Sequence, residues 1–400
     1  MAGTSGGLTL LDGIRIVAFS QFLMGPAACQ YLADMGADVV KVEQPGRGAW
    51  ERSWAGADTF INGVSAFFLL GNRNQRSVAL DLKSPAGVSA ARRLITRADV
   101  IIENFRPGVM DRLGLGYEEV RQTNPRVVYA SGSGYGSEGP YRDLPGQDLL
   151  IQALSGLAAN TGSAEQGPTV AGAAVVDQHS ASLLAMGILA ALVHRERTSE
   201  GQRVEVTLMQ GALDLQTEPV VYHLNGAQLE RPHSQLADTF HAAPYGLYAT
   251  ADGHVAISMT PIATLSAAVG DPDELQPYQD PTVAYTHRDE IRRILDPLIR
   301  QRTTAEWVAC LRERAIWCAP VNELDATFKD EAVRFLDPVL EFEHREAGTV
   351  RVLRHPVRYS SGRAGLTRQP PALGEHTAEV LEEVGCSPAE IEAVIFKEGG

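Results

Sequence analysis

Short apolar runs alternate with amphipathic stretches along the first half of the chain. The runs are six to nine residues long and rich in Val and Ile, which is typical of buried strands. The stretch after Ser84 has helical periodicity, with Ser84 placed to cap the helix and Pro85 in its first turn. Strands joined by helices of this length predict an α/β, doubly wound parallel sheet, whose ligands lie at the carboxyl ends of the strands. The strands are expected at 14–20, 37–43, 77–82, 98–105, 126–132 and 201–209.

The pattern changes near Asn225, where the chain becomes rich in His, Pro and short turns. Residues 245–259 predict a hairpin with Asp252-Gly253 in its turn, and helical patterns follow at 288–302 and 304–314. The last segment again mixes a strand pattern and a helix pattern. We therefore expect a large Rossmann-like domain, a smaller α+β domain in mid-chain and a segment that returns to the large domain, at 1–225, 226–325 and 326–400.

Composition narrows the class of protein. The 400 residues carry a formal net charge of −14, which argues against non-specific binding of nucleic acid. The apolar run 181–193 is too short to cross a bilayer, and the N-terminus does not have the pattern of a signal peptide. The four cysteines and ten histidines show no metal-ligand spacing. These features favour a cytoplasmic protein with free thiols, no membrane segment and no bound metal.

A glycine-rich segment at Gly134–Gly139 reads GYGSEG and follows a predicted strand. A dinucleotide-binding fingerprint needs a helix directly behind the glycines, whereas here Pro140 and Pro145 intervene. We interpret the segment as a flexible loop over an active site rather than a nicotinamide site. The sequence also lacks the GxSxG elbow of a serine hydrolase.

Basic residues cluster in two segments that a doubly wound sheet can bring to one end. Arginine and lysine side chains at that end of the sheet would suit the phosphates of a ligand. For each residue alone, the competing interpretation is a solvent-exposed position on the rim of a helix or turn. Two neighbouring clusters in an acidic protein favour an anion site. The residues are Arg73, Arg76 and Lys83 in the first cluster, and Arg106 and Arg112, beside Asn104, in the second.

Asp177 heads the longest apolar helix of the chain. A carboxylate at a helix N-terminus meets unpaired amides and the positive end of the dipole, so its pKa is expected to fall. Such a group suits a nucleophile or an electrostatic partner rather than a general acid. Spacing alone favours a capping role, although one carboxylate can both cap and react.

Six motifs occur in an order that resembles the class III CoA-transferases, a group that includes the formyl-CoA:oxalate and carnitine CoA-transferases. The α-methylacyl-CoA racemases share the fold. The resemblance covers nearly the whole chain and implies a Rossmann-like domain and a small domain, with two subunits threaded through each other as an interlocked homodimer. The motifs read GPAACQYLADMGADVVKVEQPGRG, NRNQRSVALDLK, ENFRPGVMDRLGLGYE, GYGSEGPYRDLPGQDLLIQALSGLAANTG, VVDQHSASLLAMGILAALVHRERTSEGQRVEVTL and PALGEHTAEVL.

The resemblance implies a role for several residues. Asp177 matches the family's nucleophile, which moves CoA between an acyl-CoA and a carboxylic acid through an aspartyl-CoA thioester. The active-site loop would include Gly134, Gly136 and Gln147, with the glycine amides binding oxyanions. Coenzyme A would enter as a substrate, with no tightly bound cofactor. The matching contacts to CoA are Asn104, Phe105, Arg112, Leu80, Lys83 and Arg76.

Departures from the family patterns bear on the substrate. Leu23 and Gln44 stand where formyl-CoA transferase has Gln and Arg, and 231–246 lacks its run of glycines, which argues against formyl-CoA and oxalate. Leu23 and Met24 suggest a less polar acyl pocket. Gln147 replaces the His of the racemases and cannot exchange a proton, so a 2-methylacyl-CoA racemase is kept only as the alternative.

Overall fold

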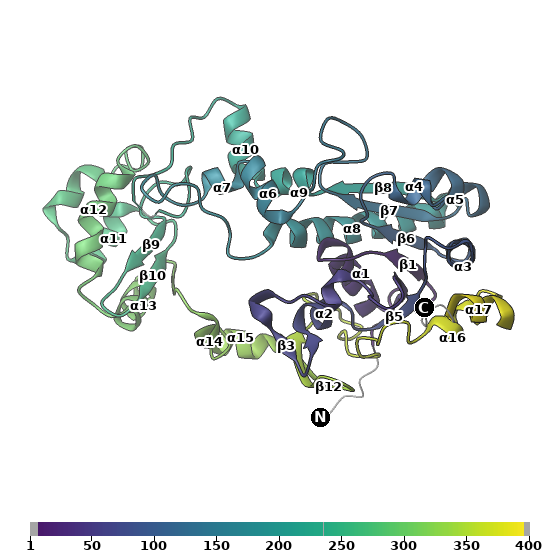
Figure 1. Cartoon of the computed structure of the whole chain (residues 1–400). Helices are drawn as coiled ribbons and strands as arrows, with labels where there is room; N and C mark the ends of the chain where they lie inside the picture. Colours follow the sequence, from purple (N-terminus) through teal and green to yellow (C-terminus); the bar gives the residue numbers. More distant parts are fainter. Residues whose placement is uncertain (1–6, 235, 396–400) are drawn as a thin grey trace. The chain divides into compact units, whose positions relative to one another are not determined.

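The computed structural model describes residues 7–234 and 236–395, which form two compact units (Figure 1). The first unit contains the described residues up to Asp148, Val175–Gly211, and the described residues from Asp337 on. The second contains Leu149–Ala174 and Ala212–Leu336. The second unit thus starts earlier than the expected small domain and includes a separate segment before the long helix. The assignment of separate roles to the expected domains stays a prediction.

The first unit is built on a six-stranded parallel sheet with the order β5-β2-β1-β6-β7-β8. The predicted α/β class is confirmed, and each expected strand has a counterpart. The third strand, β5, begins and ends earlier than the predicted 77–82 and ends at Ala79. The chain turns after Ala79, and Ser84 then caps the next helix. The strands are β1 (Arg15–Phe19), β2 (Asp38–Glu43), β5 (Gln75–Ala79), β6 (Val100–Glu103), β7 (Val128–Ser133) and β8 (Gln202–Thr207).

Helices cover both faces of this sheet. On one face, α3 (Pro85–Thr96), α5 (Tyr117–Thr123) and α16 (Thr377–Glu383) bury an aliphatic core on β1, β2, β6 and β7. On the other face, α1 (Met24–Asp34) and α8 (Val175–Thr198) pack against each other and against the strands. From β1 the chain adds β2 and β5 on one side of the sheet, and β6, β7 and β8 then follow on the other side of β1. The topological switch point therefore lies between β1 and β6.

Two further pairs of strands lie outside the parallel sheet, and of these four strands the sequence predicted only the one in the last segment of the chain. The pair β12 (Val339–His344) and β13 (Gly348–Leu353) is antiparallel and packs its apolar side on Leu69. The pair β3 (Phe60–Ile61) and β4 (Val64–Ser65) is two residues long on each side. Strands this short carry no readable alternation, which is why the sequence pattern missed β3 and β4.

The start of α3 follows the prediction: the Ser84 side chain accepts a hydrogen bond from the Gly87 amide at 3.0 Å. We expect Ser84→Ala to lower the free energy of unfolding by about 0.5–2 kcal/mol, because one first-turn amide loses its partner. Urea denaturation of both proteins measures the difference. Ser89→Ala, at an exposed position inside the same helix, is the matched control, and equal stabilities of the two variants would contradict the capping role.

The second unit contains a three-stranded antiparallel sheet with the order β11-β10-β9. The predicted hairpin is confirmed as β9 (Gly246–Ala249) and β10 (His254–Ile257), and β11 (Cys318–Pro320) adds the third strand. The predicted helices are also present, as α12 (Arg288–Ile299) and α13 (Thr304–Glu313), and with α11 (Ile262–Val269) they surround one apolar core.

Helix α8 is longer than the apolar run at 181–193 suggested. Its 24 residues are sufficient in length and apolar composition to cross a membrane, but one helix of this kind is weak evidence for a membrane protein. The helix packs on α1, β7 and β8, and near its end the buried Arg195 side chain pairs with the Asp99 carboxylate at 2.9 Å. These contacts are those of a core helix in a folded domain.

Candidate active site

The carboxyl ends of β1 and β6 are joined by the Asn104 side chain. Its Nδ2 donates to the Gln21 carbonyl at 2.8 Å, and its Oδ1 accepts from the Gln21 amide at 2.9 Å. Both bonds hold the segment after β1 against the segment after β6. Asn104 therefore occupies the switch point of the sheet, where ligands of doubly wound proteins bind.

Close approaches of glycine backbone connect this edge to the glycine loop. A Cβ on Gly132 would lie 2.1 Å from the Met24 Cε atom, and a Cβ on Gly134 would lie 2.6 Å from the Gly146 Cα atom. The missing side chains thus let α1 approach β7 and let the loop fold back on itself. No helix opens directly behind Gly139, since α6 begins only at Asp148, so the structural context of a dinucleotide fingerprint is absent.

Asp148 caps the helix that Asp177 heads. Its Oδ2 atom accepts hydrogen bonds from the amides of Val176 and Asp177, at 2.8 and 3.0 Å. Asp177 is the third residue of α8, and no hydrogen bond reaches its carboxylate from any described residue. The expected capping role of Asp177 is therefore wrong, because a carboxylate 29 residues earlier in the chain fills it.

The pKa of Asp177 is also displaced in the direction opposite to the expectation. Burial, with a smaller contribution from the negative charge of Asp148, raises this pKa to about 7. Both effects disfavour the ionised form of a carboxyl group. At neutral pH the group is divided between acid and carboxylate, and the carboxylate is a stronger base than an exposed aspartate.

The structure brings part of the predicted site together. Gln147 is exposed and directly precedes Asp148, so it lies next to the residue that caps α8, and Gly134 contacts the same loop through Gly146. The amide of Gly136, however, already donates to the Ser133 hydroxyl at 2.9 Å. Gly134 and Gln147 thus remain near Asp177, while the Gly136 amide is engaged within the loop.

The predicted CoA contacts differ in accessibility. Arg112 and Lys83 are exposed, and Phe105 is half-buried behind Asn104. Leu80 is only 1% exposed and packs in the core under α3, so its side chain cannot reach a ligand at the surface. A contact of this segment with CoA therefore stays a prediction, and it could involve only the backbone of Leu80.

The first basic cluster is largely internal. Arg73 is buried and forms an ion pair with Asp34. Arg76 is buried as well, and its guanidinium binds Asp38 at 2.6 Å and two carboxylates of α16. The geometry does not support Arg76 as a CoA contact, because its donors are used by partners that lie far away in the sequence.

A cavity of about 220 Å³ opens beside β6, β7 and β8, and its lining includes Phe105 and Arg106, which the sequence analysis had singled out. Glu103 lies in it, directly before Asn104, and burial raises its pKa to about 7. The motif drew attention to Asn104, Phe105 and Arg106 but not to Glu103, although alternation along a strand places Glu103 on the opposite face from Asn104. Among the described residues, no group of His, Cys, Asp and Glu has the arrangement of a metal site.

Comparison with known proteins agrees with this geometry. Residues 11–377 match CoA-transferase family III. An acyl-CoA transferase of Fusarium pseudograminearum is 36% identical over 98% of this chain and 88% of its own. A succinyl-CoA:glutarate CoA-transferase of Mus musculus is 32% identical over 94% of this chain and 86% of its own.

A solved structure leads to the same family. A CAIB/BAIF family protein from Brucella suis superimposes with a TM-score of 0.81 at 29% identity, over 95% of this chain and 100% of that one. The chain therefore belongs to CoA-transferase family III, which confirms the resemblance seen in its sequence. It is an enzyme of the class III CoA-transferases, and CoA thioesters are the substrates of that class.

Proposed function

We propose that the enzyme moves CoA from an acyl-CoA thioester to a carboxylic acid through a covalent aspartyl-CoA thioester on Asp177. One observation carries the assignment. The Asp177 carboxylate lies in the first turn of α8, without a hydrogen-bond partner among the described residues, while Asp148 satisfies the neighbouring amides. A carboxylate that is not engaged in capping is available to attack a thioester.

The first half of the reaction loads CoA onto the enzyme. An Asp177 oxygen bonds to the thioester carbon, the carbon–sulfur bond breaks, and CoA leaves as a thiolate. The thiolate then attacks the Asp177 carbon of the mixed anhydride. The donor acid departs with the bridging oxygen, and an aspartyl-CoA thioester remains. Each step is an acyl transfer through a covalent intermediate.

The second half returns the carboxylate. The acceptor carboxylate attacks the aspartyl thioester, which releases the CoA thiolate and forms a second mixed anhydride. The thiolate attacks the acceptor's carbonyl carbon, and Asp177 leaves with the bridging oxygen. The product is the new acyl-CoA, and one oxygen atom of the acceptor stays on Asp177.

We assign the remaining contacts from their position and chemistry. Gly134 and Gln147 lie in the loop beside Asp148 and would supply donors to the developing oxyanions.

Asn104 and Phe105 would line the path of the pantetheine arm, and the exposed cations Arg112 and Lys83 suit the phosphates of CoA. Arg76 is left out, and Leu80 would act only through its backbone.

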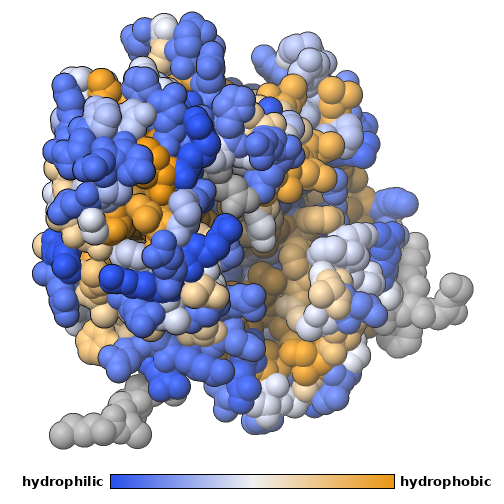
Figure 2. Space-filling model, turned by 90° about the vertical axis from the view of Figure 1, so that its left-hand side faces the viewer, coloured by the Kyte–Doolittle hydropathy of each residue, from blue (hydrophilic) through white to orange (hydrophobic). Residues whose placement is uncertain are grey.

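We also infer that the enzyme is a homodimer, interlocked as the resemblance implies, with the mid-chain unit as its small domain. Large apolar side chains are exposed on α8 and in the second unit, and apolar patches are visible on the face drawn in Figure 2. The exposed residues include Met186, Leu224, Trp317, Leu324 and Phe335. Analytical ultracentrifugation tests this assignment, and a monomer at micromolar concentration would refute it.

The four cysteines are free thiols, which suits the cytoplasm.

The alternative, a 2-methylacyl-CoA racemase, needs a second proton-exchanging group beside the α-carbon. Gln147 cannot serve, but Asp148 lies beside Asp177, whose pKa burial raises to about 7, so the racemase alternative is tested directly. We expect no deuterium incorporation at the α-carbon of 2-methylacyl-CoA in D₂O without an acceptor acid. Mass spectrometry of the thioester measures it, with added acceptor acid as the positive control for transfer. Exchange at a rate comparable to transfer would favour the racemase.

A further inference from the structure

Four aromatic side chains form a connected cluster directly after β1. The ring centroids of Phe22 and Trp50 are 4.5 Å apart and nearly parallel, and those of Trp50 and Trp54 are 5.0 Å apart. Phe67 closes the cluster edge-on, 5.0 Å from Trp54 and 6.1 Å from Phe22. Trp54 is 39% exposed and the other three rings are half-buried, so the cluster presents aromatic surface to a ligand rather than filling a core. We call it the aromatic stack.

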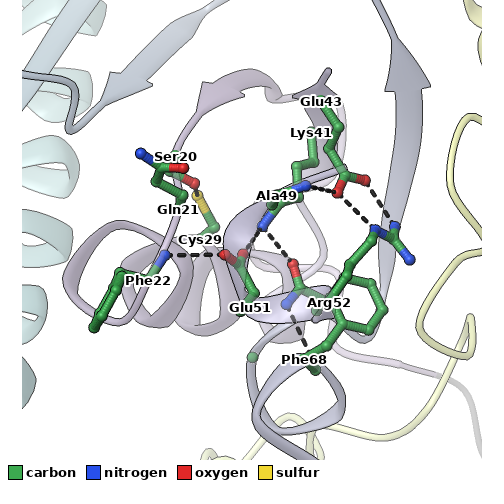
Figure 3. A network of polar contacts seen from close by, with 12 residues as sticks. Ser20, Gln21, Phe22, Cys29, Lys41, Glu43, Ala49, Glu51, Arg52 and Phe68 are labelled. Atoms are coloured by element: carbon green, nitrogen blue, oxygen red, sulfur yellow. Dashed lines mark hydrogen bonds and ion pairs between the residues drawn. The ribbon is translucent and has the colours of Figure 1, made fainter. Parts of the chain in front are cut away.

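The aromatic stack is held by a buried ion pair. Phe22 has a φ of +73°, which a side chain other than glycine rarely adopts, and its amide donates to Glu51 Oε2 at 3.0 Å. The other Glu51 oxygen pairs with Lys41, which also donates to Asn72 at 2.9 Å (Figure 3). The side chains of Lys41 and Glu51 are 1% and 0% exposed. The strained backbone of Phe22 is thus fixed by the Glu51 carboxylate, which the ion pair with Lys41 holds in place.

The aromatic stack is continuous with the proposed CoA path. Phe22 follows Gln21, whose backbone is bonded in both directions to Asn104. It also precedes Met24, whose side chain lies against Gly132 at the end of β7. The stack therefore adjoins the switch point of the sheet, where an acyl group attached to CoA would lie.

The two cations bonded to this segment are already paired. Lys41 pairs with Glu51, and Arg52 forms two hydrogen bonds of 2.7 Å with Glu43 and lies over the Phe68 ring. Neither can meet a second carboxylate without abandoning a buried partner. A charged acyl end placed here would lose its hydration without gaining a counter-charge, which is costly.

We propose that the aromatic stack is the acyl-chain pocket of this enzyme and selects monocarboxylic acids with an aliphatic or aromatic chain over dicarboxylic acids. This rests on the proposed CoA transfer. The acyl chain packs on the faces of Trp50 and Trp54 while its thioester carbon lies toward Asn104. Trp54 is the specificity-determining residue, since it is the most exposed ring of the stack. Glu51 is a positioning residue that acts through Phe22.

The test is a substrate panel. Hexanoate, phenylacetate, succinate and glutarate, each with its CoA thioester, are assayed in all donor–acceptor pairs, and kcat/KM is obtained by mass spectrometry of the thioesters. We expect the wild type to prefer hexanoate and phenylacetate by at least about tenfold over the two dicarboxylates. Trp54→Ala is expected to lower kcat/KM for the apolar acids by about tenfold or more, mainly through KM, with the dicarboxylates unchanged. Trp54→Phe restores most of the preference.

Two matched controls separate the pocket from general damage. Leu353→Ala removes an exposed apolar side chain at the end of β13 and leaves the preference unchanged. Arg47→Ala removes the exposed cation nearest to Trp50 in sequence and also leaves it unchanged. If Trp54→Ala fails to fold by circular dichroism, Trp54→Phe and Trp54→Leu replace it, and equal losses for all four acids in the folded variants overturn the proposal.

The proposal is also overturned if the wild type prefers dicarboxylates. It is likewise overturned if Arg47→Ala removes the wild-type preference for the apolar acids. A change of oligomeric state in Trp54→Ala without a change of preference would instead make the stack a subunit contact and reject the pocket. These results leave the proposed transfer intact as long as Asp177→Ala is inactive toward every acid of the panel. If Asp177→Ala transfers CoA normally, the proposed function fails, whatever the preference of the wild type.

Discussion

Asp177→Ala is expected to lower CoA transfer by about 10⁴-fold or more, with the fold intact, because the proposed mechanism needs the Asp177 carboxyl group in every covalent step. Asp177→Glu is expected to keep a trace of activity, because a carboxylate remains but its carbon is displaced. Turnover of acyl-CoA with a carboxylic acid, followed by mass spectrometry, gives the rates. Asp325→Ala, at an exposed position of the second unit, is the control and should match the wild type. Transfer at the wild-type rate by the alanine variant would reject the mechanism.

Replacing Asp177 is also expected to change stability. The substitution that removes activity should stabilise the folded protein at high pH. A carboxyl group with a raised pKa binds more protons in the folded state, so stability falls as pH rises from about 4 to about 7. Removing Asp177 should therefore raise the melting temperature relative to the wild type above pH 7. The difference should shrink as pH falls toward 4, where the group is protonated in both states. Thermal unfolding of Asp177→Asn at pH 5 and pH 8 measures it.

Asp148→Asn is expected to move the acidic limb of the kcat/KM profile to lower pH. The carboxamide oxygen can still accept from the amides of Val176 and Asp177, but the negative charge that helps to raise the pKa of Asp177 is gone. More of Asp177, the proposed nucleophile, is then ionised below pH 7, and kcat/KM of the variant should exceed that of the wild type several-fold near pH 5.5. Burial is the larger cause of the raised pKa, so the shift is partial.

A matched variant separates charge from hydrogen bonding. Asp148→Ala removes both, so it should shift the profile and also lower the melting temperature by loss of the cap. If Asp148→Asn leaves the acidic limb where the wild type has it, Asp148 does not act on Asp177 through its charge.

The parallel sheet of the first unit could be predicted because the sequence signals for its strands and helices are local. Alternating apolar runs and helices defined the parallel sheet, and Ser84 with Pro85 marked the start of α3. The motif around Asp177 likewise located the candidate nucleophile and its family. Segments whose strands are only two residues long left no pattern to read, so β3 and β4 were missed.

The errors concern partners that lie far away in the chain. Asp177 was expected to cap its own helix and to have a lowered pKa, but Asp148 takes the amides and adds a like charge. Arg76 was expected to bind CoA, but it is buried under carboxylates more than 300 residues later in the chain. Electrostatic interactions between such residues depend on which segments the fold brings together. The hydrophobic periodicity of the sequence gives no information about them.

The most direct test of the covalent mechanism follows one oxygen atom. The acceptor acid is labelled with ¹⁸O in its carboxylate, and a single turnover is run with the enzyme in excess over the acyl-CoA donor. Mass spectrometry of the Asp177 peptide and of the released donor acid then locates the label. We predict one ¹⁸O in Asp177 and none in the donor acid. Label in the donor acid with an unlabelled Asp177 peptide would mean that the acceptor attacks the donor directly and would contradict the aspartyl intermediate.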